Sequence, residues 1–444
     1  MRDLSKPQVM DRPRKSTQNS KAQEAGRKWV EQLEKQLEAA TSQFDEALAT
    51  LPVPHRRVER WKYTPVNGWW RAIGKRAQIT AKQAGCEPCP IPGLDAYRLV
   101  FVNGEFDAEA SDLPVYPGIV CSPLSLVPQT DQAPRGSNSL EQEDWFAALN
   151  GKFAKEGLFL RIGDGISLDR PLLVHHHSTG EGCAAFLRHD IEIGVNAEIK
   201  LIHWSTASQP SRGVVNISTK ATVGSNGRFQ LDKVQDEEGH IQHMAFEEIQ
   251  QAQDSRVDVY TMTIRGQWVR NDASFRLDGK GAHAELNGIY LPDNTEFVDN
   301  HTTVDHRAAH CTSSEHYKGI LYGKSTGVFN GKVFVRPDAQ QTNAYQQNAN
   351  ILVSDQATMN AKPELEIYAD DVKCSHGCTI GQFDEEALFY AQSRGVGVDA
   401  AKAMLVHAFI DEILDGVAVH EVRLEVNHRL AEKHQWTEWS DHLE

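Results

Sequence analysis

The 444-residue sequence has no apolar run close to the roughly 18 residues that a membrane-spanning helix requires. Its first segment is polar and mixed in charge, so it also lacks the apolar stretch of a secretory signal. We therefore predict a disordered leader over residues 1–27. A transit peptide is the alternative, and Asp3, Asp11 and Glu24 count against it.

Cysteine and positive charge are both scarce. Seven cysteines are an odd number and too few for a disulfide framework in a chain of this length, so a reducing compartment such as the cytoplasm fits better. The formal net charge of -15 repels phosphate backbones, which argues against general nucleic-acid binding. The cysteines are Cys86, Cys89, Cys121, Cys183, Cys311, Cys374 and Cys378.

The common catalytic motifs are missing too. The sequence has no GxSxG nucleophile elbow, no HExxH zinc motif and no pair of CxxC motifs. Residues 319–325 resemble a phosphate loop, but only three residues separate Gly319 from Gly323, where four are needed to wrap the phosphates. We therefore expect no nucleotide hydrolysis and no turnover by this chain alone.

The periodicity of the chain predicts three ordered regions after the leader. Residues 28–155 form a helical and mixed region, because apolar residues recur at three- and four-residue steps from Trp29 to Leu48. Residues 156–381 consist of short strand-like runs separated by small or Asn-containing breaks. Residues 382–444 carry three helical patterns. The fold class is therefore mainly β, with a β-helix favoured over a sandwich or jelly roll.

The densest group of potential metal ligands is Cys374, His376 and Cys378. In a strand, residues two apart face the same side, so these three would line up. Thiolate and imidazole suit soft and borderline metals, but three ligands leave a closed zinc site one short. From the residues alone, the favoured interpretation is two buried thiols and a solvated histidine beside a glycine turn.

Other cysteines and histidines give weaker signals. The single CxxC of Cys86 and Cys89 is half of a zinc site, a redox pair or a structural feature, and we favour the last. The run 175–177 is three histidines that cannot converge in a strand, so we predict a surface edge. Four more are interpreted as separate core or surface residues: His301, His306, His310 and His316.

A series of motifs between residues 287 and 397 resembles the SufB/SufD family of iron–sulfur cluster assembly scaffolds. Near the N-terminus, residues 61–64 (Trp-Lys-Tyr-Thr) resemble the SufD branch rather than the SufB branch. The later motifs are Asn287-Gly288, His301, Asp305-His306, His316-Tyr317-Lys318-Gly319, Phe329-Asn330-Gly331, Gln346-Gln347-Asn348, Lys362-Pro363-Glu364-Leu365-Glu366-Ile367, residues 370–377 and Ser393-Arg394-Gly395.

The resemblance implies a right-handed parallel β-helix between N-terminal and C-terminal helical parts. It implies a non-catalytic scaffold that pairs with SufB and binds the ABC ATPase SufC through residues 384–416. Cys374 and His376 would lie at the SufB junction, where a transient iron–sulfur cluster forms. Cys378 matches no family position. A reduced flavin in the complex and a homodimer are further implications that no motif locates.

Two other functions stay open from the sequence. A β-helix carbohydrate-active enzyme would need a cluster of Asp, Arg or Lys on one exposed face, and no such cluster is evident. A stand-alone metal-binding protein would hold metal without partners, whereas a scaffold is expected to hold little. Neither nucleic acid nor a membrane is expected as a partner.

Overall fold

The computed structural model describes residues 16–37, 41–72, 81–87, 89–128, 130–132 and 139–436. Residues 1–15 of the predicted leader lie outside this part. Helix α1 spans Ser16–Glu34, so it begins inside the segment that the sequence analysis assigned to the leader. Among the described residues, no helix is both long and apolar enough to cross a membrane.

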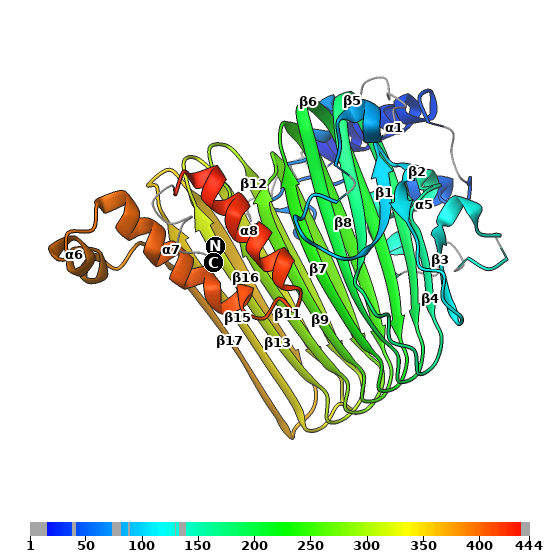
Figure 1. Ribbon diagram of the computed structural model, residues 1–444. Coiled ribbons are helices and arrows are strands. Elements are labelled where there is room, and N and C mark those ends of the chain that lie inside the picture. Colours follow the sequence, from blue (N-terminus) through cyan, green and yellow to red (C-terminus); the bar gives the residue numbers. More distant parts are fainter. Residues whose placement is uncertain are drawn as a thin grey trace, which may run out of the picture.

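The body is a parallel β-helix, which confirms the predicted fold class and excludes a sandwich (Figure 1). One face pairs β7, β9, β11, β13, β15 and β17 in order. The other pairs β6, β8, β10, β12, β14 and β16. The strands are β4 (Leu158–Ile162), β5 (Leu172–Ile193), β6 (Glu198–Val223), β7 (Arg228–Glu237), β8 (His240–Gln251), β9 (Arg256–Arg265), β10 (Trp268–Leu277), β11 (His283–Tyr290), β12 (Phe297–His306), β13 (Thr312–Leu321), β14 (Thr326–Val335), β15 (Thr342–Leu352), β16 (Thr358–Ile367) and β17 (Val372–Gly381).

The corners of the coil fall at the Asn and Asp breaks seen in the sequence. Asn196, Asn226, Asp254 and Asn294 all have φ between 51° and 56°. Asn and Asp tolerate this left-handed conformation better than other non-glycine residues. The chain therefore turns from one face to the next at positions where its side chains favour the turn.

Alternation along the strands fills the interior of the coil with apolar side chains. Leu172, Val174, Leu201 and Leu231 face inward and are fully buried. Because successive side chains in a strand point to opposite faces, their neighbours point outward. Helices and loops cover much of the outer surface, so many outward residues are buried as well.

The N-terminal region packs against the early coils around a group of tryptophans. Trp29 on α1 lies edge-on to Trp69, with ring centroids 6.0 Å apart, and both are buried. The region contains α2 (Asp45–Thr50), η1 (Glu59–Trp61), η2 (Trp69–Arg71), α3 (Ala81–Ala84), β1 (Tyr97–Val102), β2 (Glu105–Asp112), β3 (Ile119–Pro123), η3 (Leu124–Leu126), α4 (Ser139–Glu143) and α5 (Trp145–Phe153).

The Trp-Lys-Tyr-Thr segment joins this region to the β-helix. The guanidinium of Arg270 lies 4.0 Å from the ring centroid of Trp61 and 2.8 Å from Asp299. Thr64 donates a hydrogen bond to the same carboxylate at 2.5 Å. Arg270 and Asp299 are fully buried, so their pairing compensates the desolvation of both charges.

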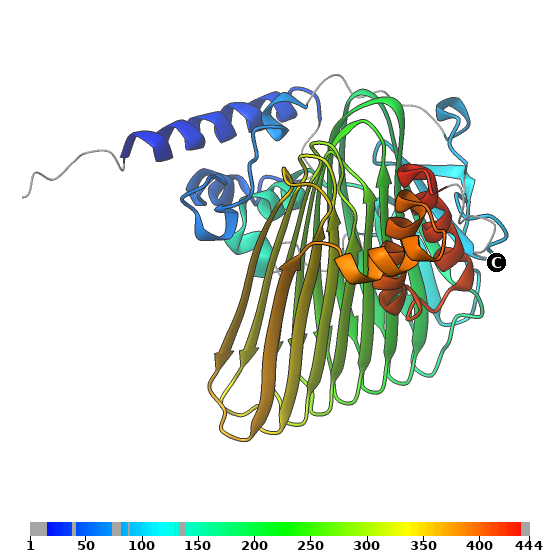
Figure 2. The ribbon, with the colours of Figure 1, turned by 90° about the vertical axis from the view of Figure 1, so that its left-hand side faces the viewer.

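Three helices follow the last strand: α6 (Glu385–Ser393), α7 (Val398–Leu414) and α8 (His420–His434). Helices α7 and α8 lie across the outer face formed by β9, β11 and β13, where Ile410 and Val422 are buried (Figure 2). Helix α6 projects beyond the coil and buries none of its residues (Figure 1).

Candidate functional site

The last coil of the β-helix ends in an open edge. Strand β17 pairs with β15 along its length, and within the described part of the chain no strand pairs with its other side. Strand β16 on the opposite face pairs only with β14 among the described strands. Both edges are parallel and extended over ten residues. Unpaired backbone groups along such an edge can pair with a strand of another chain.

The predicted ligands lie on β17, at this edge. The strand register sets Cys374, His376 and Cys378 opposite Ala344, Gln346 and Asn348, all of which are buried inside the coil. The three side chains therefore share the side that faces the interior of the coil. Cys374 is partly buried against the core, whereas His376 and Cys378 are exposed. Partial burial raises the pKa of both thiols, so both are protonated at neutral pH.

A row of buried polar groups continues inward from His376. In the strand register, His376 on β17 is paired with Gln346 on β15, and Gln346 is paired with Glu315 on β13. Gln346 donates to a Glu315 carboxylate oxygen at 3.2 Å, and Thr302 donates to the other oxygen. Burial raises the pKa of Glu315 to about 7, although both hydrogen bonds lower it. The interior behind the edge therefore holds a carboxyl group that titrates near neutrality.

Large apolar side chains are exposed around the same edge. Tyr345, Ile367, Tyr368 and Ile380 are between 41% and 58% exposed, and all lie on or beside β15, β16 and β17. Apolar side chains gathered on one exposed end are typical of protein interaction surfaces. The open edge thus combines unpaired backbone, apolar contacts and potential metal ligands.

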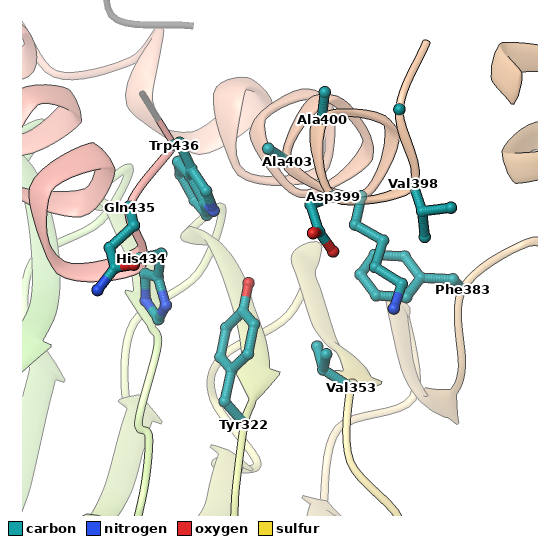
Figure 3. Close-up of a pocket in the computed structure, with 12 residues that line it drawn as sticks. Tyr322, Val353, Phe383, Val398, Asp399, Ala400, Ala403, His434, Gln435 and Trp436 are labelled. Atoms are coloured by element: carbon teal, nitrogen blue, oxygen red, sulfur yellow. The ribbon is translucent and has the colours of Figure 1, made fainter. Parts of the chain in front are cut away.

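The C-terminal helices form a second exposed feature beside the edge. On α6, Phe389 and Tyr390 are 73% and 62% exposed. At the start of α7, a cavity of about 570 Å³ opens between the helices and the late strands (Figure 3). Its lining includes Tyr322 and Trp436, whose rings stack on His434 with centroid distances of 4.4 Å and 5.3 Å.

The structure corrects the interpretation of the histidine run 175–177. All three side chains are buried, so they do not form a surface edge. They alternate between faces as expected, with His176 inside the coil, beside His189 and His203. The sequence showed the alternation, but it could not show that the N-terminal region covers the outer face of β5.

The two cysteines of the CxxC motif point to different places. Cys86 is buried, with its Sγ atom 3.9 Å from Nδ1 of His175. Cys89 instead packs near Ile91, whose carbonyl oxygen accepts from the thiol at 3.4 Å. They form no disulfide with each other. The favoured interpretation of the motif was a structural feature, and the structure places Cys86 beside His175, which is distant in the sequence.

The other four histidines do not come together. His301 lies 3.0 Å from Asp299, and His306 lies 2.9 Å from the hydroxyl of Ser313. His316 faces the C-terminal helices, and His310 is an exposed corner residue with φ of 62°. Each has a separate structural setting, in keeping with the prediction that they are core or surface residues.

Comparison with known proteins gives matches over nearly the whole described chain. The SufBD core domain of the SUF system for FeS cluster assembly matches residues 176–409, and the SufBD N-terminal region matches residues 19–174. The iron–sulfur cluster assembly protein SufD of Escherichia coli K12 is 28% identical over 387 residues, which are 86% of this chain and 89% of SufD.

Two further relatives come from photosynthetic organisms. An iron–sulfur cluster assembly SufBD family protein of Synechocystis is 27% identical over 388 residues, covering 83% of this chain and 85% of the relative. Arabidopsis thaliana protein ABCI7, named as chloroplastic, is 26% identical over 327 residues, covering 70% of this chain and 68% of the relative.

Proposed function

The chain belongs to the SufBD family of iron–sulfur cluster assembly proteins, and on this basis we propose that it is a SufD-type scaffold without turnover of its own. It pairs with a SufB-type scaffold through the open edge of β17, and it binds a SufC-type ATPase through residues 384–416. We propose that it acts in the cytoplasm, and that residues 28–155, 156–381 and 382–444 are its functional regions.

The observation that carries this proposal is the position of Cys374 and His376 on β17, whose side away from β15 pairs with no strand of the described chain. Neither residue has enough neighbouring ligands to hold a metal alone, since a closed site needs about four. A partner strand alongside β17 brings its own side chains next to them. A nascent cluster, as cargo, then has ligands from both chains and forms only in the complex.

The cluster assembly role is tested in cells that depend on this system. His376→Ala and Cys374→Ser are expected to abolish the activity of a reporter iron–sulfur enzyme, while both variants still co-purify with the SufB-type partner. Ser375→Ala is the matched control, because Ser375 lies between them on the opposite side of β17. Intact cluster assembly with His376→Ala would contradict the proposed role of the edge.

The ATPase contact is supported by helix α6, which buries none of its residues and exposes Phe389 and Tyr390. Deleting residues 384–444 would also remove the buried Ile410 and Val422 and uncover the face of β9, β11 and β13 on which α7 and α8 pack, so point substitutions are the cleaner test. Phe389→Glu is expected to abolish co-purification with the ATPase. Leu126→Glu, at a side chain 71% exposed in the N-terminal region, should leave it unchanged.

The packing of the C-terminal helices on the β-helix also lets a bound ATPase influence the junction between the two scaffolds. Helix α7 packs directly on β11 and β13, and Lys318 on β13 donates to the carbonyl oxygen of Phe409 on α7 at 2.7 Å. A force on the C-terminal helices would therefore reach β13, which is separated from the edge strand β17 by β15 alone. Reduced flavin stays a prediction from the family alone.

A further inference from the structure

Three potential metal ligands meet on the outer face of the first coil, far along the chain from Cys374. Cys86 follows α3, and His175 and His177 lie two apart on β5, so they point to the same side. One ligand atom from each lies within 4.8 Å of the others. All three side chains are buried, with exposures of 8%, 1% and 7%.

A single hydroxyl group orients both imidazole rings. The Oγ1 atom of Thr206 on β6 lies 2.8 Å from Nε2 of His175 and 2.8 Å from Nδ1 of His177. Metal-binding histidines typically use the second ring nitrogen for such a bond, which fixes the ring and its tautomer. Thr206 therefore holds both rings by hydrogen bonds to the nitrogens that would not contact an ion.

The remaining nitrogen of His177 supplies independent support. Its Nε2 atom is buried and has no hydrogen-bond partner in the structure. A buried polar atom without a partner is destabilising, and native proteins rarely leave one. A bound ion at this position would satisfy the nitrogen.

We propose that Cys86, His175 and His177 bind one divalent ion of the zinc type, with a water molecule as the fourth ligand. One thiolate and two imidazoles form a borderline ligand set that suits Zn²⁺ in tetrahedral geometry. The separation of 3.9 Å between Sγ of Cys86 and Nδ1 of His175 needs only a small contraction around an ion. The ion fastens the segment after α3 to the first coil.

The protonation states fit this role. Burial lowers the pKa of His177 to about 4, so its imidazole is neutral and able to bind at pH 7. Burial, then the charges of Asp107 and Glu87, raises the pKa of Cys86 to about 12. Binding of an ion would displace the proton of the thiol, as it does at any thiolate ligand.

The test is a titration of Co²⁺ into the full chain after removal of metal with a chelator. We expect one equivalent to bind, with the absorption bands of four-coordinate cobalt and a thiolate charge-transfer band, and Zn²⁺ to displace it. Cys86→Ser should abolish the thiolate charge-transfer band. His177→Gln should abolish stoichiometric binding of cobalt. Thr206→Val should weaken binding about 10–100-fold, as is typical of outer partners.

Matched controls separate this site from the other thiols. Cys89→Ser removes the neighbouring cysteine and Cys374→Ser removes the one at the edge, and both variants should bind cobalt normally. Zn²⁺ should raise the melting temperature of the unmodified chain and leave that of Cys86→Ser unchanged. The shift in melting temperature on adding Zn²⁺ is measured within each protein, so it remains informative even if a variant is less stable.

The outcomes that overturn the proposal are specific. They are the absence of stoichiometric binding in the unmodified chain, and binding that survives in both Cys86→Ser and His177→Gln. Binding lost only with Cys374→Ser would place the ion at the open edge and equally refute this site. One structural ion at this site means that metal content alone no longer separates a scaffold from a stand-alone metal-binding protein, so the assembly role is read out through His376.

Discussion

Replacing Glu315 with glutamine tests the buried polar row behind the open edge. Glu315 is 1% exposed, and its carboxyl group is surrounded by Thr302, Gln346 and the apolar interior of the coil. Glutamine has nearly the same shape and no charge.

The magnitude follows from the raised pKa of Glu315. A rise from 4.5 to about 7 corresponds to about 3 kcal/mol, at about 1.4 kcal/mol per pKa unit. The folded chain binds the proton more tightly than the unfolded chain, so this group lowers stability as pH rises from 4.5 to 7. The penalty is absent below this window and complete above it.

Denaturant unfolding at pH 5 and pH 8 measures the effect. Glu315→Gln should be more stable than the unmodified chain by up to about 3 kcal/mol at pH 8, with most of this gain lost at pH 5. The difference in unfolding free energy between the variant and the unmodified chain is compared at the two pH values, so that contributions from other titrating groups cancel. An equal effect of the substitution at both pH values would refute the assigned protonation of Glu315.

Three further predictions concern other parts of the molecule. Arg270→Met leaves Asp299 buried without its partner and should cost about 3–5 kcal/mol in unfolding free energy, whereas Arg276→Met, at a partly exposed pair, should cost under about 1 kcal/mol. Burial keeps the pKa of His203 well below 6.5, so its stabilising effect is lost as pH falls below 6.5; His203→Leu should lessen acid sensitivity in unfolding experiments. Ile380→Lys should weaken binding to the SufB-type partner in pull-down assays without lowering the melting temperature.

The fold was largely predictable because its signals are local. Period-two alternation marks the strands, and Asn or Asp at corners such as Asn226 and Asp254 favours the left-handed turn. The boundary of α1 was missed by the sequence analysis, because residues 16–27 carry no apolar face. The register between neighbouring strands could not be predicted from the spacing of the breaks, because the strands differ in length and pair with strands that are distant in the sequence.

The site was predictable only in part. Alternation placed Cys374 and His376 on one side of a strand, but their exposure depends on β17 being the last strand of its face. Burial of His175 and His177 depends on a segment about 90 residues earlier in the chain covering β5. Such long-range cover leaves no periodic signal, so the grouping of Cys86 with two histidines appears only in three dimensions.

Hydrogen exchange along β17 tests the central claim most directly. In the chain alone, amides of Val372–Gly381 that point away from β15 should exchange quickly, because the edge is unpaired. In complex with the SufB-type partner, these amides should become strongly protected, while amides in β2 should change little. Unchanged exchange in β17 within a stable complex would show that the scaffolds join elsewhere.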